Sequence, residues 1–121
     1  MSDGDIPVLD AAILAELRDA TGGDEEFIVD LVETYVTEGA ANLEGILAAA
    51  AAGDPVSIVR PAHTLKSSSA SLGAMRLSAI AKAIEEAGRA AVSDGLKEEA
   101  ELARATWLDT LEAFAAAGLR R

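Results

Sequence analysis

The sequence contains no cysteine, only 3% aromatic residues and a single histidine, His63. Without cysteine the chain can form neither disulfides nor thiolate metal sites. One histidine cannot build a zinc site unless three carboxylates converge on it, and no Asp or Glu lies near His63 in the sequence. Gly22, Gly23 and Gly73 stand as isolated helix breaks and form no phosphate-binding loop. We therefore expect no metal site, no intrinsic cofactor, no ATP site and no autokinase activity.

Long apolar runs are also missing. No stretch approaches the roughly 18 consecutive apolar residues of a membrane span. The opening residues 1–10 are acidic and lack the apolar core of a secretory signal. We therefore expect a cytoplasmic protein that does not enter a membrane. The net charge of −11 argues against nucleic acid as a partner.

Negative charge is absent from one segment of this acidic chain. Residues 55–84 contain no Asp or Glu, but they contain four basic residues: Arg60, Lys66, Arg76 and Lys82. A basic segment in an acidic protein favours a partner, or a transferred group, that is negatively charged. The alternative is that this segment is simply well packed and that solubility is provided elsewhere.

Helical periodicity and helix-boundary residues predict one short and four longer helices. The short helix is expected at about residues 10–20, and the longer ones at about 24–52, 55–72, 75–91 and 96–117. Alanine and leucine supply most of the apolar residues, and the connections are short. These features predict an all-α fold, an antiparallel up-and-down four-helix bundle with a short additional N-terminal helix. We expect a single domain over residues 1–121, with the bundle at about 24–117.

The histidine falls on the outward side of the third longer helix. A helix turns by about 100° per residue. The predicted inward stripe consists of Ile58, Ala62, Leu65, Ser69 and Leu72. The predicted outward neighbours of His63 are Val59, Ser67, Ala70 and Ala74. All four are small or medium-sized, so a second protein could approach the imidazole closely. Without a further motif, an exposed histidine on a helix is more often an ordinary surface residue.

A neutral imidazole can itself act as a nucleophile. Histidine in water has a pKa near ~6.5, so at physiological pH one ring nitrogen usually has a free lone pair that can attack a phosphoryl group. Lys66 is close enough on a helix to place its ammonium near the phosphoryl oxygens. Ser67, one turn after His63, can offer a hydroxyl. A serine hydrolase is disfavoured, because no neighbouring Asp or Glu in the sequence is placed to orient the ring.

Other notable residues are assigned to the core or to solvated surface. The aromatic residues predicted to pack in the core are Tyr35, Trp107 and Phe114. The acidic residues predicted to lie on solvated faces are Glu85, Glu86, Glu98, Glu99 and Glu101. Ser69 is expected to face inward and to donate its hydroxyl hydrogen to the Leu65 carbonyl.

Residues 62–74, Ala-His-Thr-Leu-Lys-Ser-Ser-Ser-Ala-Ser-Leu-Gly-Ala, combine His-x-Leu-Lys with a Leu-Gly at fixed distance. An apolar ladder and a carboxylate follow: Leu77, Ala81, Ile84 and Glu85. This pattern closely resembles the histidine-containing phosphotransfer (HPt) domain family. Leu9-Asp10 and Glu25-Glu26-Phe27 are also similar, so the resemblance covers nearly the whole chain. Ser67 departs from the pattern, because a glycine often follows the lysine. Serine is still small, so we expect close docking to survive and only fine tuning to change.

The resemblance implies a bundle whose exposed histidine accepts a phosphoryl group from the aspartate of one response-regulator receiver domain and passes it to another. It implies that His63 is phosphorylated and that Lys66 and Ser67 flank the phosphoryl group. It also implies a docking surface that includes Val59, Ala70 and Ala74. Mg²⁺ and the acidic catalytic pocket are expected in the receiver, and a hybrid sensor kinase is an expected further partner.

We therefore expect a monomeric phosphoryl carrier and not an enzyme. The alternative is a helical module that docks on a receiver or a sensor kinase without being phosphorylated. Phosphate transfer with a purified receiver domain separates the two.

Overall fold

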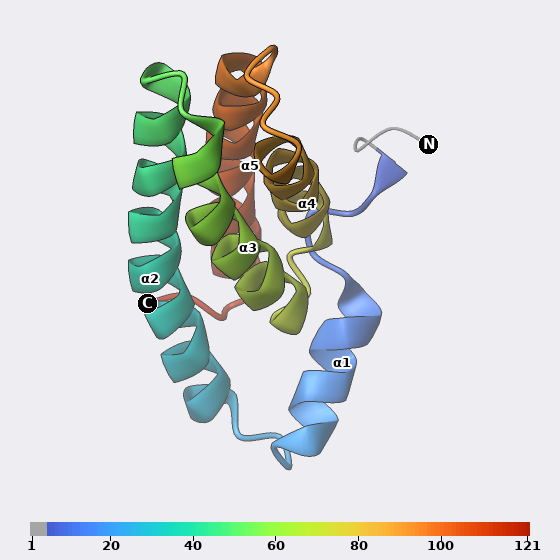
Figure 1. Ribbon diagram of the computed structural model, residues 1–121. Helices are drawn as coiled ribbons and strands as arrows, with labels where there is room; N and C mark the ends of the chain where they lie inside the picture. Colours follow the sequence, from blue (N-terminus) through green and yellow to red (C-terminus); the bar gives the residue numbers. More distant parts are fainter. Residues whose placement is uncertain (1–4) are drawn as a thin grey trace.

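The computed structural model describes residues 5–121, which form five helices and no strand. The helices are α1 (Ala11–Ala20), α2 (Glu25–Ala51), α3 (Pro55–Ser71), α4 (Met75–Arg89) and α5 (Leu96–Ala116). Helices α2 to α5 run alongside one another, and α1 diverges from them near the turn between α3 and α4 (Figure 1). The predicted all-α fold, a four-helix bundle with a short N-terminal helix, is confirmed. The single domain over residues 1–121 stays a prediction, and residues 1–4 lie outside the described residues.

Aspartate side chains cap the N-termini of three of the helices. The Oδ1 atoms of Asp10, Asp24 and Asp54 accept hydrogen bonds from backbone N–H groups in the first turns of α1, α2 and α3, over distances of 2.9, 3.0 and 3.2 Å. Pro55 follows Asp54 at the first position of α3, where a backbone N–H would have no partner in the helix. Local sequence therefore sets where these helices begin.

The core joins aliphatic side chains to three aromatic rings. The ring centroid of Tyr35 lies 5.4 Å from that of Trp107 and 5.9 Å from that of Phe114. All three residues are buried, which confirms their assignment to the core. A Cβ atom at Gly39 would lie 2.5 Å from the Trp107 ring. Glycine at this position therefore lets the Trp107 ring of α5 pack directly against the backbone of α2.

One buried polar contact differs from the prediction. Ser69 is buried as expected, but its hydroxyl pairs with the phenol of Tyr35 at 2.7 Å and not with the Leu65 carbonyl. Burial raises the pKa of the Tyr35 phenol to about 12, and the hydrogen bond with Ser69 acts in the opposite direction. The pair is therefore neutral, and it joins α2 to α3 inside the core.

The segment before α1 is fixed to the turn between α3 and α4. The Asp10 N–H donates to the Gly73 carbonyl at 2.8 Å, and the Arg76 N–H donates to the Pro7 carbonyl at 3.1 Å. The Nε of Arg76 also donates to the Ile6 carbonyl at 2.7 Å. Gly73 has a φ of +83°, and a Cβ atom there would lie 3.3 Å from the Asp10 carbonyl oxygen. Glycine therefore allows both the turn and the close approach of the segment.

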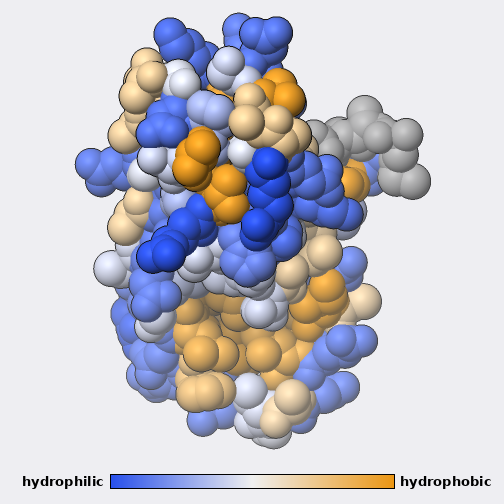
Figure 2. Space-filling model, viewed as in Figure 1, coloured by the Kyte–Doolittle hydropathy of each residue, from blue (hydrophilic) through white to orange (hydrophobic). Residues whose placement is uncertain are grey.

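Apolar side chains remain open where α1 leaves the bundle. They gather between α1 and α2 on the face shown in Figure 2, and Leu17, Leu31 and Leu72 are among the residues that line a cavity of about 380 Å³ there. None of the helices in residues 5–121 is long and apolar enough to cross a membrane.

Candidate functional site

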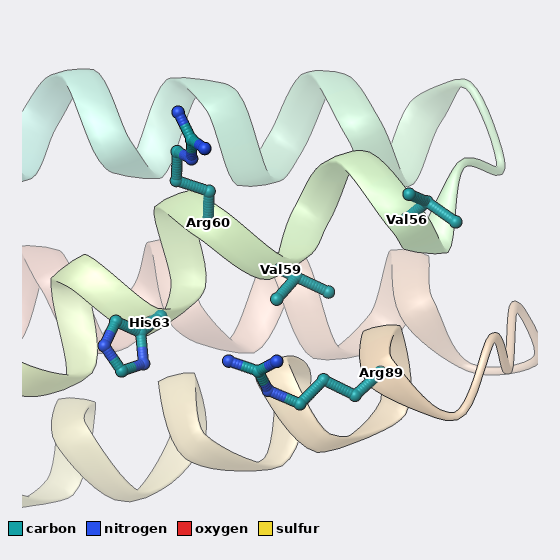
Figure 3. A pocket seen from close by; sticks show the side chains of 5 residues that line it. All are labelled: Val56, Val59, Arg60, His63 and Arg89. Atoms are coloured by element: carbon teal, nitrogen blue, oxygen red, sulfur yellow. The ribbon is translucent and has the colours of Figure 1, made fainter.

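His63 lies on α3 beside α4, and 53% of its side chain is exposed. Its ring borders a depression of about 370 Å³ that is also lined by Val56, Val59, Arg60 and Arg89. The guanidinium of Arg89 extends from α4 toward the ring and Val59, whereas Arg60 points away toward α2 (Figure 3). On the face shown in Figure 2, this depression appears as apolar surface between strongly hydrophilic side chains. The predicted exposure of the imidazole is confirmed.

The carboxylate of Glu85 on α4 joins the imidazole to two cations. Its Oε2 atom lies 2.8 Å from Nδ1 of His63, and its Oε1 atom accepts a hydrogen bond from Nζ of Lys66 at 2.6 Å. Arg89 donates to Oε2 from Nη2 at 2.8 Å and from Nε at 3.1 Å. We call these four residues the Glu85 cluster. Only 6% of the Glu85 side chain is exposed, so a buried carboxylate supports three side chains that reach the surface.

The charge of Glu85 fixes the proton on the ring. The hydrogen bond from Lys66 is the largest influence that lowers the pKa of Glu85 to about 2; hydrogen bonds from Arg89 and His63 add to it, and burial opposes it. At neutral pH the carboxylate is ionised and can only accept hydrogen bonds. Nδ1 of His63 must therefore be the donor. In a neutral ring, this tautomer leaves the lone pair on Nε2, which has no hydrogen-bond partner among residues 5–121.

One prediction about this surface is wrong. Glu85 was expected on a solvated face, but its exposed fraction is 4%. The sequence around His63 contains no Asp or Glu that could orient the ring, and the carboxylate that does so comes from another helix. Glu85 is 22 positions away, and the pairing of α3 with α4 brings it to Nδ1. Lys66 lies in the same cluster, but its amine is bound to Glu85 and does not stand free.

Helical periodicity indicates that Glu85 lies on the buried face of α4. Ala81, Ile84 and Gly88 are buried on α4, and Glu85 shares their face because side chains three and four positions apart lie together. A carboxylate on an inward face requires a partner. Arg89, one turn after Glu85, is the second functional candidate that the sequence analysis did not identify.

The predicted outward neighbours of His63 differ in their exposure. Ser67 is exposed, and Val59 and Ala70 are partly exposed. Ala74 is wrong as a surface residue, because its exposed fraction is 0%. The prediction placed Ala74 on the outward face by helical periodicity, but α3 ends at Ser71 and the chain turns at Gly73. The Ala74 N–H then donates to the Ser69 carbonyl at 2.8 Å and holds residue 74 inside the turn.

The described part of the chain contains no group of three or more His, Cys, Asp or Glu side chains placed to hold a metal ion. The Glu85 cluster instead combines one imidazole with two cations and one carboxylate. This arrangement can present a nucleophilic nitrogen and positive charge to an anionic group.

Comparison with known proteins gives a family and a similar structure. Residues 30–117 match the family model of the Hpt domain. No curated protein matches the chain significantly. Among solved structures, the chain is similar to histidine-containing phosphotransfer protein B (HptB) from Pseudomonas aeruginosa PAO1, with 26% sequence identity and a TM-score of 0.83. The alignment covers 92% of this chain and 94% of that one. The segment before α1, α1 itself and the start of α2 lie outside the residues matched by the family model.

Proposed function

Because this chain belongs to the Hpt domain family, we propose that it is a phosphorelay intermediate that carries a phosphoryl group on Nε2 of His63. One observation supports this assignment above the others. The ring has an open Nε2 atom, while its Nδ1 atom is held by the ionised and buried carboxylate of Glu85. That arrangement suits a nucleophile that must approach another protein.

In the accepting step, the lone pair of Nε2 attacks the phosphorus of an aspartyl phosphate on a receiver domain. The Nε2–P bond forms as the P–O bond to the aspartate breaks, and the aspartate leaves as a carboxylate. The ring becomes positively charged because Nδ1 keeps its proton, and the Glu85 carboxylate at 2.8 Å stabilises that charge. Glu85 is thus a positioning residue, since it sets the tautomer and the orientation of the ring.

In the donating step, the Nε2–P bond breaks and its electron pair returns to the ring. A carboxylate of the second receiver forms the new P–O bond. No proton has to leave Nδ1 in either direction, so the same hydrogen bond to Glu85 serves both steps. A carrier with this geometry needs neither an ATP site nor a general base of its own.

The two cations of the Glu85 cluster supply positive charge near the transferred group. Lys66 and Arg89 reach the surface beside His63, with 30% and 61% of their side chains exposed. Phosphoryl transfer depends largely on positioning and on neutralising the phosphoryl oxygens. The role of Lys66 is therefore to neutralise the negative charge of the phosphoryl oxygens. Ser67 is small and exposed, so it leaves room for a receiver surface.

Hpt domains interact with receiver domains and kinases in two-component relays, and we propose that this chain has both kinds of partner. Val59 and Ala70 would contribute to the docking surface for the receiver. Any Mg²⁺ would be held by the acidic pocket of the receiver, and a hybrid sensor kinase would supply the phosphoryl group upstream.

The test is transfer of a radioactive phosphoryl group from a purified, phosphorylated receiver domain to this protein. The wild-type chain should acquire an acid-labile label, and His63→Gln should acquire none while its circular dichroism stays helical. Glu86→Gln changes an exposed carboxylate next to Glu85 and should be labelled like the wild type. Undiminished labelling of His63→Gln would overturn the assignment. Wild-type protein that binds the receiver but takes no label would instead support the docking module that is not phosphorylated.

A further inference from the structure

A second depression borders the site on the Lys66 side. It has a volume of about 520 Å³, and its lining includes Ile6, Lys66, Ser67, Met75 and Lys82. Lys66 also donates to Glu85, which holds the imidazole of His63. The depression is therefore continuous with the Glu85 cluster. A protein that reaches Nε2 of His63 would lie close to it.

One wall of this depression comes from outside the family match. Ile6 precedes α1, whereas the Hpt domain model begins at residue 30. The position of Ile6 is nevertheless fixed, because its carbonyl accepts a hydrogen bond from Nε of Arg76 at 2.7 Å. Two further hydrogen bonds hold the rest of the segment, one between Pro7 and Arg76 of α4 and one between Asp10 and Gly73 in the turn before α4. The backbone that carries the Ile6 side chain is thus held in place by hydrogen bonds.

The lining combines apolar surface with positive charge. Ile6 and Met75 are partly exposed, and the charged residues in the lining are the cations Lys66 and Lys82. Among residues 5–121, no acidic side chain lines it. An apolar side chain flanked by carboxylates complements such a surface. A receiver domain is expected to have carboxylates around the aspartate that exchanges the phosphoryl group, so it can supply the acidic part of this match.

We propose that the segment of residues 6–10 is part of the receiver-docking surface and that Ile6 helps to determine which receiver is accepted. This inference rests on the proposed function. The segment would add an apolar contact beside the site without touching the reacting atoms. Ile6 is therefore a specificity-determining residue and not a catalytic one.

The experiment compares two phosphoryl donors on Ile6→Asp, Ile6→Ala and the wild-type protein. The first donor is a phosphorylated receiver domain, and the second is phosphoramidate, which needs no docking surface. Leu108→Asp is the matched control, because Leu108 is an apolar residue of α5 that is 57% exposed. Ile6→Asp should lower the second-order rate of transfer from the receiver about tenfold through lost contact and charge repulsion. Ile6→Ala should give a smaller loss, and Leu108→Asp none.

Labelling of His63 by phosphoramidate should be the same in all four proteins. A receiver rate that is unchanged in both Ile6 variants would overturn the inference. A similar loss with Leu108→Asp, or a parallel loss with phosphoramidate, would also overturn it, because the effect would then not come from docking at Ile6. Failure of the proposed function has a different signature, since the wild-type protein would then take no label at His63 from either donor.

Discussion

Glu85 and Tyr35 are both 4% exposed, and each bonds to a side chain of α3 from a neighbouring helix. The partner of Tyr35 is Ser69, which is fully buried, so this pair is neutral and closed from solvent. The partners of Glu85 are His63, Lys66 and Arg89, and all three reach the surface. Two equally buried polar groups on the same bundle therefore face opposite environments.

The difference shows that burial alone does not identify a functional polar group. Burial raises the pKa of Tyr35 to about 12, whereas hydrogen bonds, that from Lys66 above all, lower the pKa of Glu85 to about 2. The first shift keeps the Tyr35 phenol neutral beside Ser69, and the second keeps the Glu85 carboxylate ionised beside its cations. The Tyr35–Ser69 pair fixes how α2 packs on α3. The Glu85 cluster uses a buried charge to control an exposed imidazole, and we propose that this control is its function.

The largest expected effect is a difference in the rate of phosphoryl transfer between variants of Glu85 and of Tyr35. Glu85→Gln should slow transfer between a phosphorylated receiver and His63 by about tenfold or more, because a neutral amide no longer fixes the Nδ1–H tautomer or stabilises the charged ring. Tyr35→Phe should transfer at the wild-type rate. Rapid-quench measurements with one receiver domain provide the comparison. Equal rates for Glu85→Gln and wild type would show that the carboxylate is only structural.

The next effect concerns stability. Tyr35→Phe, which should keep its transfer rate, should lose stability. Tyr35→Phe leaves the Ser69 hydroxyl without its partner in the core, which should lower the free energy of unfolding by about 1–2 kcal/mol. Urea denaturation followed by circular dichroism measures this loss. Adding Ser69→Ala should recover part of it, because the unpaired hydroxyl is then removed. A double variant that is less stable than Tyr35→Phe would argue that the hydroxyl has another role.

A smaller effect is expected for Lys66. Lys66→Ala removes a cation from the Glu85 cluster and should slow transfer by about threefold to tenfold. Its free energy of unfolding should fall by about 1–3 kcal/mol, because the variant removes a hydrogen bond to the buried carboxylate of Glu85. Lys97→Ala is the control, because Lys97 is an exposed cation of α5 and lines neither depression beside His63. Equal rates for Lys66→Ala and wild type would remove Lys66 from the transfer step.

The last effects should appear as stability changes outside the neutral pH range, at its two opposite ends. The pKa of Glu85 falls from 4.5 to about 2 on folding, so its stabilising contribution is present above pH 4.5 and is lost as the pH falls toward 2. The pKa of Tyr35 rises from 10.0 to about 12, so its contribution is present below pH 10 and is lost as the pH rises toward 12. Chemical denaturation of the wild type, Glu85→Gln and Tyr35→Phe tests both directions. Stability curves that stay parallel in both ranges would contradict these shifts.

The sequence predicts the fold and the exposure of His63 because both depend on local signals. The Asp10, Asp24 and Asp54 caps lie next to the helices that they begin, and the period of the helix gives the outward side of α3. The periodic argument fails where the helix ends. Ala74 lies beyond the end of α3, so its assignment to the outward face was wrong.

The partners of buried polar groups are harder to predict because they are distant in sequence. Tyr35 and Ser69 are separated by 34 positions, and His63 and Glu85 by 22. Their pairing depends on which helices become neighbours and on the register between them. The polarity of Glu85 suggested solvent, yet its position on the inward face of α4 suggested burial. The structure resolves the conflict by placing His63, Lys66 and Arg89 around its carboxylate.

The central claim is that Glu85 keeps the proton on Nδ1 and leaves Nε2 of His63 to accept the phosphoryl group. Nitrogen-15 and phosphorus-31 NMR of protein labelled at its single histidine measures both points directly, before and after phosphorylation by a receiver domain. The expected result is an Nδ1–H tautomer in the free protein and phosphorus coupled to Nε2 in the phosphorylated one. Phosphorus coupled to Nδ1, or a free ring protonated on Nε2 alone, would contradict the account.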